Sequence, residues 1–232
     1  MGLFLKSACV LCGDSVSAII SLCNACKNDF PVLDNACQQC GLPLESASDS
    51  SVICGQCIQS PPAVDYTLCL YHYQIPLDYL ITELKYNQKL PHASILGQLF
   101  LARLLDVAPE DVPDAILPVP LHKSRLVKRG FNQSLEIARP IAKKLKIPIA
   151  LDIVRRKRQT RAQADLTAIE RKKNVRDCFE IIKQETLSAY QHIVIIDDVV
   201  TTGSTTNELA RLLKKAGVKK VGVWSVARAV IR

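Results

Sequence analysis

The chain has 232 residues, of which 48% are hydrophobic and 22% are charged, a balance that supports a packed core and argues against wholesale disorder. This length suits one ordinary globular domain with a small accessory module. No run reaches the roughly 18 apolar residues that a membrane span needs, and the N-terminus has no basic leader. We therefore expect a soluble, cytoplasmic protein with no membrane span.

The formal charge of +8 is concentrated in one part of the chain. Residues 122–176 carry 17 basic and 4 acidic side chains, whereas residues 1–60 carry 2 basic and 5 acidic ones. Such a basic block attracts polyanions, although basic runs are also common on solvated helical faces. The candidate polyanion contacts in this block are Lys128, Arg129, Arg155, Arg156, Lys157 and Arg158.

Cysteines dominate the first sixty residues. Eight of the ten form four Cys-x-x-Cys pairs, namely Cys9/Cys12, Cys23/Cys26, Cys37/Cys40 and Cys54/Cys57. Two such pairs supply the four thiolates of a closed, structural Zn²⁺ site, so we expect two structural zinc ions. Disulfides are disfavoured in a cytosolic chain, and a redox role is disfavoured without a thioredoxin-like setting. We expect sequential pairing (first with second, third with fourth), with a crossed arrangement as the alternative.

The cysteine pairs end before SPPAV at residues 60–64, and strand-like and helix-like stretches alternate after it. We interpret SPPAV as a linker. We expect a zinc module over residues 1–60 and a second domain over residues 61–232. Strands are predicted, in chain order, at residues 67–73, 115–120, 193–197 and 220–229. Helices are predicted at residues 76–86, 93–105, 134–145 and 206–217. This alternation is typical of an α/β fold with a parallel sheet flanked by helices.

Single residues mark details of these elements. Pro140 should kink or end the third helix, and Gly217 stands where the C-cap of the fourth is expected. Gly13, Gly41 and Gly55 follow cysteines, where knuckle turns favour a positive φ. The remaining cysteines, Cys69 and Cys178, stand in apolar surroundings and are expected in the core.

The sequence IVIIDDVVTTGST at residues 193–205 is the strongest functional signal. Ligands of open α/β sheets bind beyond the carboxyl ends of the strands, where Asp197 and Asp198 are expected. The loop behind them contains Thr201, Thr202, Gly203, Ser204 and Thr205, and its N–H groups and hydroxyls could cradle a phosphate at a helix N-terminus. Paired acids suit vicinal hydroxyls, so the segment predicts a ribose 5-phosphate site. The alternative is an ordinary strand-to-helix loop with a capping Ser or Thr.

No G-x-x-x-x-G-K-[ST] sequence occurs, which disfavours a P-loop NTPase. Instead, the thirteen residues 193–205 resemble the signature of type I phosphoribosyltransferases for 5-phosphoribosyl-1-pyrophosphate (PRPP). Nearly the whole chain resembles the ComF family. The motifs that carry this resemblance are the four Cys-x-x-Cys pairs, LKY (84–86), PVPLH (118–122), KRGFNQS (128–134), TRAQADL (160–166) with Arg171 and Asn174, and the PRPP signature.

The resemblance implies a type I phosphoribosyltransferase-like domain behind a double zinc-ribbon module. Asp197 and Asp198 would hold the ribose hydroxyls, and the loop of residues 201–205 would wrap the 5-phosphate. The residues that match the pyrophosphate loop are Pro120, Leu121 and His122. Residues 156–176 match a flexible loop whose candidate contacts are Arg161, Gln163, Arg171 and Asn174. A Mg²⁺ ion would arrive with the pyrophosphate.

ComF proteins are associated with natural transformation, which implies handling of incoming single-stranded DNA on the cytoplasmic side. We therefore expect a DNA-uptake protein that binds PRPP and single-stranded DNA, the latter through the basic block. One alternative is an active phosphoribosyltransferase with an unknown acceptor in nucleotide salvage, although Thr201 stands where purine-using relatives tend to carry an acid. A third reading is a zinc-ribbon adaptor that docks a competence helicase or a membrane channel protein.

Overall fold

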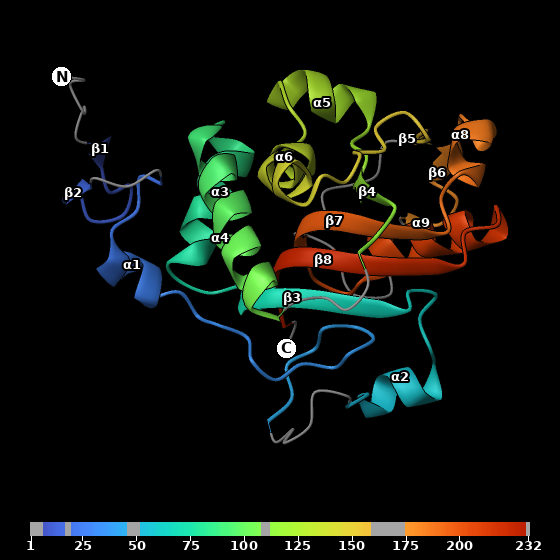
Figure 1. Cartoon of the computed structure of the whole chain (residues 1–232), viewed down its shortest axis with the longest axis horizontal. Helices are drawn as coiled ribbons and strands as arrows, with labels where there is room; N and C mark the ends of the chain where they lie inside the picture. Colours follow the sequence, from blue (N-terminus) through green and yellow to red (C-terminus); the bar gives the residue numbers. More distant parts are fainter. Residues whose placement is uncertain (1–6, 17–19, 46–51, 108–111, 159–174, 231–232) are drawn as a thin grey trace.

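A parallel β-sheet forms the centre of the protein. The computed structural model describes residues 7–16, 20–45, 52–107, 112–158 and 175–230, and its main sheet has four strands in the order β3-β8-β7-β4 (Figure 1). These strands are β3 (Tyr66–His72), β8 (Lys220–Arg228), β7 (His192–Val200) and β4 (Ala115–Pro118). All neighbouring pairs are parallel, so the carboxyl ends of the strands meet at one edge.

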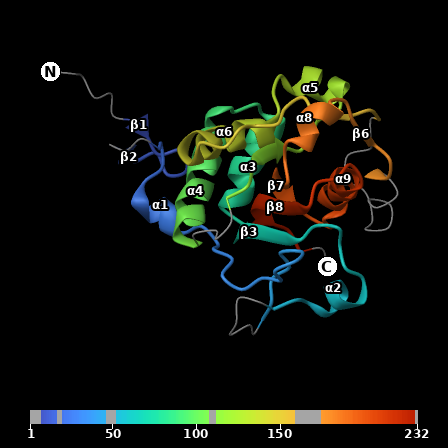
Figure 2. The ribbon, with the colours of Figure 1, turned by 45° about the vertical axis from the view of Figure 1, so that its right-hand side comes forward.

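Helices cover both faces of this sheet (Figures 1 and 2). One face packs against α3 (Leu77–Tyr86), α4 (Pro91–Val107) and α6 (Gln133–Leu145). The other packs against α9 (Ser204–Lys215), α8 (Gln184–Ser188) and the antiparallel pair of β5 (Val154–Arg156) and β6 (Phe179–Ile181).

Strand β7 shows why the sequence adopts this arrangement. Val194 and Ile196 lie in the core on the α3, α4 and α6 side, whereas Ile193 and Ile195 lie in the core on the α9 side. Because successive strand residues point to opposite faces, a strand that is buried on both sides needs an unbroken apolar run. The sequence IVII supplies that run directly before the two acids.

The predicted strands and helices of the second domain are all present, with bounds that differ by a few residues. Strand β7 runs on to Val200, so the two acids lie within the strand and not after it. Gly217 has a φ of 105° directly after the C-cap residue Ala216 of α9, as predicted. The short helix α5 (Lys123–Arg129), the β5–β6 pair and α8 were not predicted, because segments this short have little periodicity.

Of the two outcomes expected at Pro140, a kink or an end of the helix, the end does not occur. Helix α6 continues through Pro140 to Leu145. A proline removes one backbone N–H donor from a helix, and here its ring packs where α6 crosses Gly97 of α4. Packing of the helix on both sides of the proline therefore outweighs the lost hydrogen bond.

The cysteine-rich segment forms two small units. The first contains β1 (Ser7–Ala8), β2 (Ser15–Val16) and α1 (Asn24–Asn28), and the second contains α2 (Gly55–Gln59). Gly13 and Gly41 have positive φ angles as predicted, but the prediction for Gly55 is wrong, because that residue begins α2. None of the helices in the described ranges has the length and apolar character of a transmembrane span.

The chain between the two units lies along the free edge of β3. Leu33 N donates to Leu70 O at 3.0 Å, and His72 N donates to Pro31 O at 2.8 Å. An exposed edge strand is prone to pair with another chain, and these contacts cover it. The predicted boundary at residue 60, between a zinc module and a second domain, stays a prediction.

The contact between α4 and α6 gives a first prediction. A Cβ atom at Gly97 would lie 2.5 Å from Pro140 Cγ and 2.6 Å from Ile137 O. Gly97→Ala should therefore lower the free energy of unfolding by about 1–3 kcal/mol, as overpacking usually does, although alanine is the better helix former. Urea titration followed by circular dichroism measures the change.

Gly55→Ala is the matched control, because Gly55 also lies in a helix and its Cβ would meet nothing within 4 Å. That variant should be neutral or slightly more stable. Equal stability of Gly97→Ala and wild type would show that the two helices do not approach as closely as the structure has them.

Candidate functional site

Two acidic side chains meet a lysine at the carboxyl edge of the sheet. Asp198 is buried and forms an ion pair with Lys85, which α3 contributes. Gln133 Nε2 donates to Asp198 Oδ1 at 3.4 Å. Asp197 Oδ1 accepts two hydrogen bonds, from Ser134 Oγ at 3.0 Å and from Asp198 N at 3.0 Å. We call Asp197 and Asp198 the acid pair.

The turn between α5 and α6 aims Gln133 and Ser134 at the acid pair. Helix α5 ends at Gly130, whose φ of 82° reverses the chain. Asn132 then caps α6 by accepting from Ser134 N at 3.0 Å and donates from Nδ2 to Val119 O at 3.1 Å. The motif KRGFNQS is thus a capped turn that is fixed to the end of β4.

The two acids have opposite pKa shifts. Burial and the charge of Asp198 raise the pKa of Asp197 to about 8. Burial would also raise the pKa of Asp198, but the ammonium group of Lys85 lowers it below its ordinary value. The charge of Asp198 correspondingly raises the pKa of Lys85 against the effect of burial. At neutral pH the acid pair therefore carries one proton and one negative charge, which Lys85 balances.

Two arginines from the basic block turn inward near the acid pair. Arg129 donates from Nη1 to Gln133 Oε1, and Arg156 lies with its guanidinium carbon 5.4 Å from the ring centroid of Phe179. Burial lowers the pKa of both arginines. The effect is partly offset by Asp198 at Arg129, and at Arg156 by Cys178 foremost, with a smaller contribution from Asp197. Anionic groups of a ligand would meet positive charge here.

Residues 201–203 join β7 to α9, and together with the first two residues of α9 we call them the 201–205 loop. Thr202 Oγ1 and Ser204 Oγ lie 2.8 Å apart, and Ser204 N donates to Thr202 Oγ1 at 3.3 Å. Gly203 has a φ of 70°, in the left-handed region, and α9 starts directly after it. A left-handed glycine followed by a helix N-terminus turns backbone N–H groups toward one point, as phosphate-binding loops do.

The residues that were predicted as a pyrophosphate loop lie next to the acid pair. Pro120, Leu121 and His122 follow β4, which is the neighbour of β7 in the sheet. His122 is the N-cap of α5, and its Nδ1 lies 2.8 Å from Ser124 Oγ. His122 also forms an isolated parallel bridge with Arg156, which brings the β5 segment to this edge.

The predicted DNA contacts are spread over different environments. Lys128 and Lys157 are exposed, whereas Arg155 pairs with Glu180 and Arg158 Nη2 donates to Arg176 O at 2.8 Å. Arg129 donates to Gln133, and the buried Arg156 lies over the Phe179 ring, as described above. The predicted flexible-loop contacts Arg161, Gln163, Arg171 and Asn174 lie outside the described residues.

The eight paired cysteines form two groups of four. Within each group the Sγ atoms all lie within 4.8 Å of one another. The first cluster consists of Cys9, Cys12, Cys23 and Cys26, and the second of Cys37, Cys40, Cys54 and Cys57. The predicted sequential pairing is confirmed, and Cys69 and Cys178 are buried as predicted.

The environment of the sulfurs fits a bound metal ion. Burial alone would raise the pKa of Cys9 and Cys37, but backbone N–H groups lower it to about 6 and about 7. Cys54 N, for example, donates to Cys37 Sγ at 3.2 Å. Thiolates are the form that binds Zn²⁺, and four of them per cluster would hold a structural ion.

Comparisons with known proteins match both halves of the chain. The family model described as a phosphoribosyl transferase domain matches residues 132–230, and the model described as a double zinc ribbon domain matches residues 1–69. Competence protein F from Haemophilus influenzae is 33% identical over 238 residues, which cover 97% of this chain and 99% of that protein. The chain belongs to the competence protein F family.

Other members of the competence protein F family and one solved structure extend this result. DNA utilization protein YhgH from Escherichia coli K12 is 36% identical over 90% of this chain and 91% of its own length. Competence protein ComFC from Streptococcus pneumoniae is 23% identical over 95% of this chain and 99% of its own length. A purine phosphoribosyltransferase from Pyrococcus horikoshii matches 60% of this chain and 86% of its own, with 17% identity and a TM-score of 0.32.

The predicted resemblance and fold class are therefore confirmed. Three residues at the acid pair were not predicted as site residues, namely Lys85, Gln133 and Ser134. The motifs LKY and KRGFNQS contained them, but a lysine in a helix or a glutamine near a helix N-terminus has no distinctive chemistry until its partner is known. Lys85 also lies outside the stretch that the phosphoribosyl transferase model matches.

The raised pKa of Asp197 predicts how stability depends on pH. Between its ordinary pKa of 3.8 and its folded value of about 8, the folded protein holds a proton that the unfolded chain releases. The free energy of unfolding of the wild type should therefore fall as pH rises through this range, by up to about 1.4 kcal/mol per pH unit. Asp197→Asn keeps the Oδ1 acceptor but loses this dependence.

The variant should thus be more stable than wild type near pH 8, and the difference should vanish toward pH 4. Urea titrations across this range measure it, with the exposed Asp106 changed to asparagine as the control. A variant less stable than wild type near pH 8 would show that Asp197 is ionised in the folded protein.

Proposed function

We propose that the protein binds PRPP and single-stranded DNA and acts in DNA uptake during natural transformation. The observation that carries the PRPP proposal is that the acid pair, near the end of β7, is followed directly by the 201–205 loop and is contacted by Gln133, which Arg129 holds. The names of relatives in the competence protein F family support the role in DNA uptake.

The charge state of the acid pair suits the ribose of PRPP. A protonated Asp197 beside an ionised Asp198 offers one donor and several acceptors at the end of β7. Vicinal hydroxyls can both donate to and accept from such a pair. Because Lys85 already balances the negative charge, the site as a whole favours a neutral diol over a second cation.

The two anionic ends of PRPP match the two sides of the acid pair. The 201–205 loop, with the N-terminus of α9 behind it, would take the 5-phosphate. The pyrophosphate would lie on the other side of the acid pair. There it would meet the turn at His122, which caps α5, and the guanidinium groups of Arg129 and Arg156.

Mg²⁺ would be held mainly by the pyrophosphate oxygens, as this ion usually is. Among the described residues, the groups with metal-ligand geometry are the two cysteine clusters, and a carboxylate cage for Mg²⁺ is not among them. An active transferase, the alternative function, would use the same site: an acceptor would form a bond to C1 of the ribose as the bond from C1 to pyrophosphate breaks, and pyrophosphate would leave.

Binding of PRPP can be tested with Asp197→Ala, which removes the carboxyl group that would contact the ribose. Circular dichroism checks that the variant is folded. A neutral carboxyl that both donates to and accepts from the diol loses two hydrogen bonds at about 0.5–1.5 kcal/mol each, so PRPP affinity should fall about tenfold. Isothermal titration calorimetry with Mg²⁺ and PRPP measures the change.

Asp106→Asn, which removes an exposed carboxylate on α4, should bind PRPP as wild type does. Unchanged PRPP affinity in Asp197→Ala would refute the assignment of the ribose site. Pyrophosphate release with a panel of bases, measured on the same samples, distinguishes turnover from binding alone.

Helix α5 is the surface that best fits the backbone of single-stranded DNA. It follows the predicted pyrophosphate loop and exposes Lys123 and Lys128, with Arg125 half-buried between them. Several other cations of the basic block are buried or paired, as Arg156 and Arg155 are. Exposed, closely spaced lysines bind phosphates without reading bases, and this binding weakens with salt.

A charge reversal on α5 tests this surface. Lys123→Glu with Lys128→Glu should lower affinity for single-stranded DNA about equally for all sequences. Loss of two phosphate contacts should also flatten the log–log salt slope by about 1.4, since each contact contributes about 0.7. Fluorescence anisotropy over a salt series measures both quantities.

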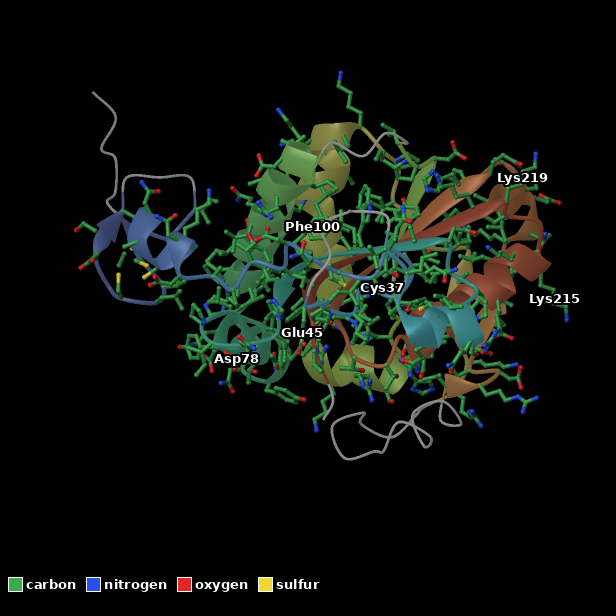
Figure 3. The ribbon with its side chains drawn as sticks, turned by 90° about the horizontal axis from the view of Figure 1, so that it is seen from below. Cys37, Glu45, Asp78, Phe100, Lys215 and Lys219 are labelled. Atoms are coloured by element: carbon green, nitrogen blue, oxygen red, sulfur yellow. The ribbon has the colours of Figure 1, made fainter. Side chains whose placement is uncertain are left out.

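The matched control is Lys215→Glu with Lys219→Glu, which changes the net charge equally. Lys215 and Lys219 are exposed and lie at the end of the molecule opposite the first cysteine cluster (Figure 3). If the control weakens binding as much as the α5 variant, net charge alone attracts the DNA and the α5 surface is wrong.

A further inference from the structure

Arg228, at the end of β8, joins two parts of the protein that are far apart in sequence. Its side chain is buried. Its Nε donates to Cys40 O at 3.1 Å, and its Nη1 donates to Val200 O at 3.2 Å and to Thr201 O. One guanidinium therefore holds a backbone carbonyl of the second cysteine cluster and the carbonyls where the 201–205 loop begins.

The acceptors around Arg228 are backbone carbonyls. They include Ala229 O at 2.6 Å in addition to those of Cys40, Val200 and Thr201. Within the described ranges, no salt bridge supplies a carboxylate to this side chain. A buried cation that loses an acceptor is costly, so moving the Cys40 carbonyl would disturb the whole set of bonds.

The turn that carries Cys37 and Cys40 is fixed directly onto β3. Thr67 N donates to Gln38 O at 2.8 Å, and Thr67 Oγ1 donates to Gln39 O at 2.7 Å. Gly41 lies so close to β3 that a Cβ atom at this position would be 2.8 Å from Cys69 Sγ.

The first cysteine cluster contacts a different region. Cys9, Val16 and Phe30 pack in the same core as α3 and α4, and the Phe30 and Tyr71 ring centroids lie 5.9 Å apart. In Figure 1 this unit lies beside α3 and α4, away from α9. The two clusters thus differ in their connection to the 201–205 loop.

We propose that Arg228 is a positioning residue that couples the second cysteine cluster to the 201–205 loop. Zn²⁺ at the second cluster fixes the Cys40 carbonyl, and the planar fork of Arg228 transmits that position to the carbonyls of Val200 and Thr201. The ordered loop then binds the 5-phosphate of PRPP more tightly, a consequence that rests on the proposed function. The first cluster has no such effect.

The primary experiment uses Arg228→Lys, which keeps the positive charge but cannot form the fork. Hydrogen–deuterium exchange of the ligand-free protein, followed by mass spectrometry, reports on the amides of residues 201–205. Their exchange should be at least about tenfold faster than in wild type, and PRPP affinity should fall about tenfold. Zinc content and the exchange of β7 core amides should stay as in wild type, and Arg211→Lys on the exposed side of α9 is the control.

A second arm removes one cluster at a time. Cys40→Ser with Cys57→Ser should speed loop exchange as Arg228→Lys does, whereas Cys12→Ser with Cys26→Ser should leave it unchanged. In the Arg228→Lys background, loss of the second cluster should add little, because the coupling is already broken. If the second-cluster variant does not fold, zinc extraction from wild type and from Arg228→Lys with a chelator gives the same comparison.

The proposal would be overturned if the amides of residues 201–205 exchanged in Arg228→Lys at the wild-type rate. It would also be overturned if removing the first cluster and removing the second changed that rate equally. The two proposals fail in different ways. If wild type does not bind PRPP but loop exchange responds to Arg228→Lys and to the second cluster alone, the coupling holds and the PRPP proposal is wrong.

Discussion

Two adjacent carboxylates in a strand that is buried on both faces repel each other and lose their hydration, and the surrounding elements offset both costs. Lys85 of α3 pairs with Asp198, and Gln133 and Ser134 at the start of α6 donate to the two acids. Burial otherwise disfavours a charged carboxylate strongly, so the positions of α3 and of the α5–α6 turn are tied to the acid pair. A proton on Asp197 completes the compensation.

The same edge of the sheet collects the remaining features because all its strands are parallel. The 201–205 loop follows β7, the His122 turn follows β4, and Arg228 ends β8. Each feature is held by backbone groups of a neighbouring element, as Asn132 is by Val119 O at 3.1 Å. A ligand at this edge would meet a preorganised set of donors and charges, which lowers the entropic cost of binding.

The cysteine-rich segment is part of this architecture as well. It covers the edge of β3 through residues 31–33 and contributes the Cys40 carbonyl to Arg228. The basic block is likewise divided by the fold, because Arg129 and Arg156 are packed against Gln133 and the Phe179 ring while Lys123 and Lys128 stay exposed on α5. Concentrated charge in sequence therefore does not mean one continuous surface.

The sequence by itself determined the features that depend on local pattern or on spacing. Apolar runs and helical periodicity predicted the strands and helices, and the Cys-x-x-Cys spacing predicted the two clusters and their pairing. Only the tertiary structure decided what meets the acid pair, because Lys85 is more than a hundred residues away along the chain and its partner follows from how α3 packs on β7. It also decided that α6 continues through Pro140, since packing against Gly97 outweighs a local preference. The role of Arg228 could not be predicted from the sequence either. The three backbone carbonyls that its guanidinium binds, those of Cys40, Val200 and Thr201, belong to distant segments that only the fold brings together.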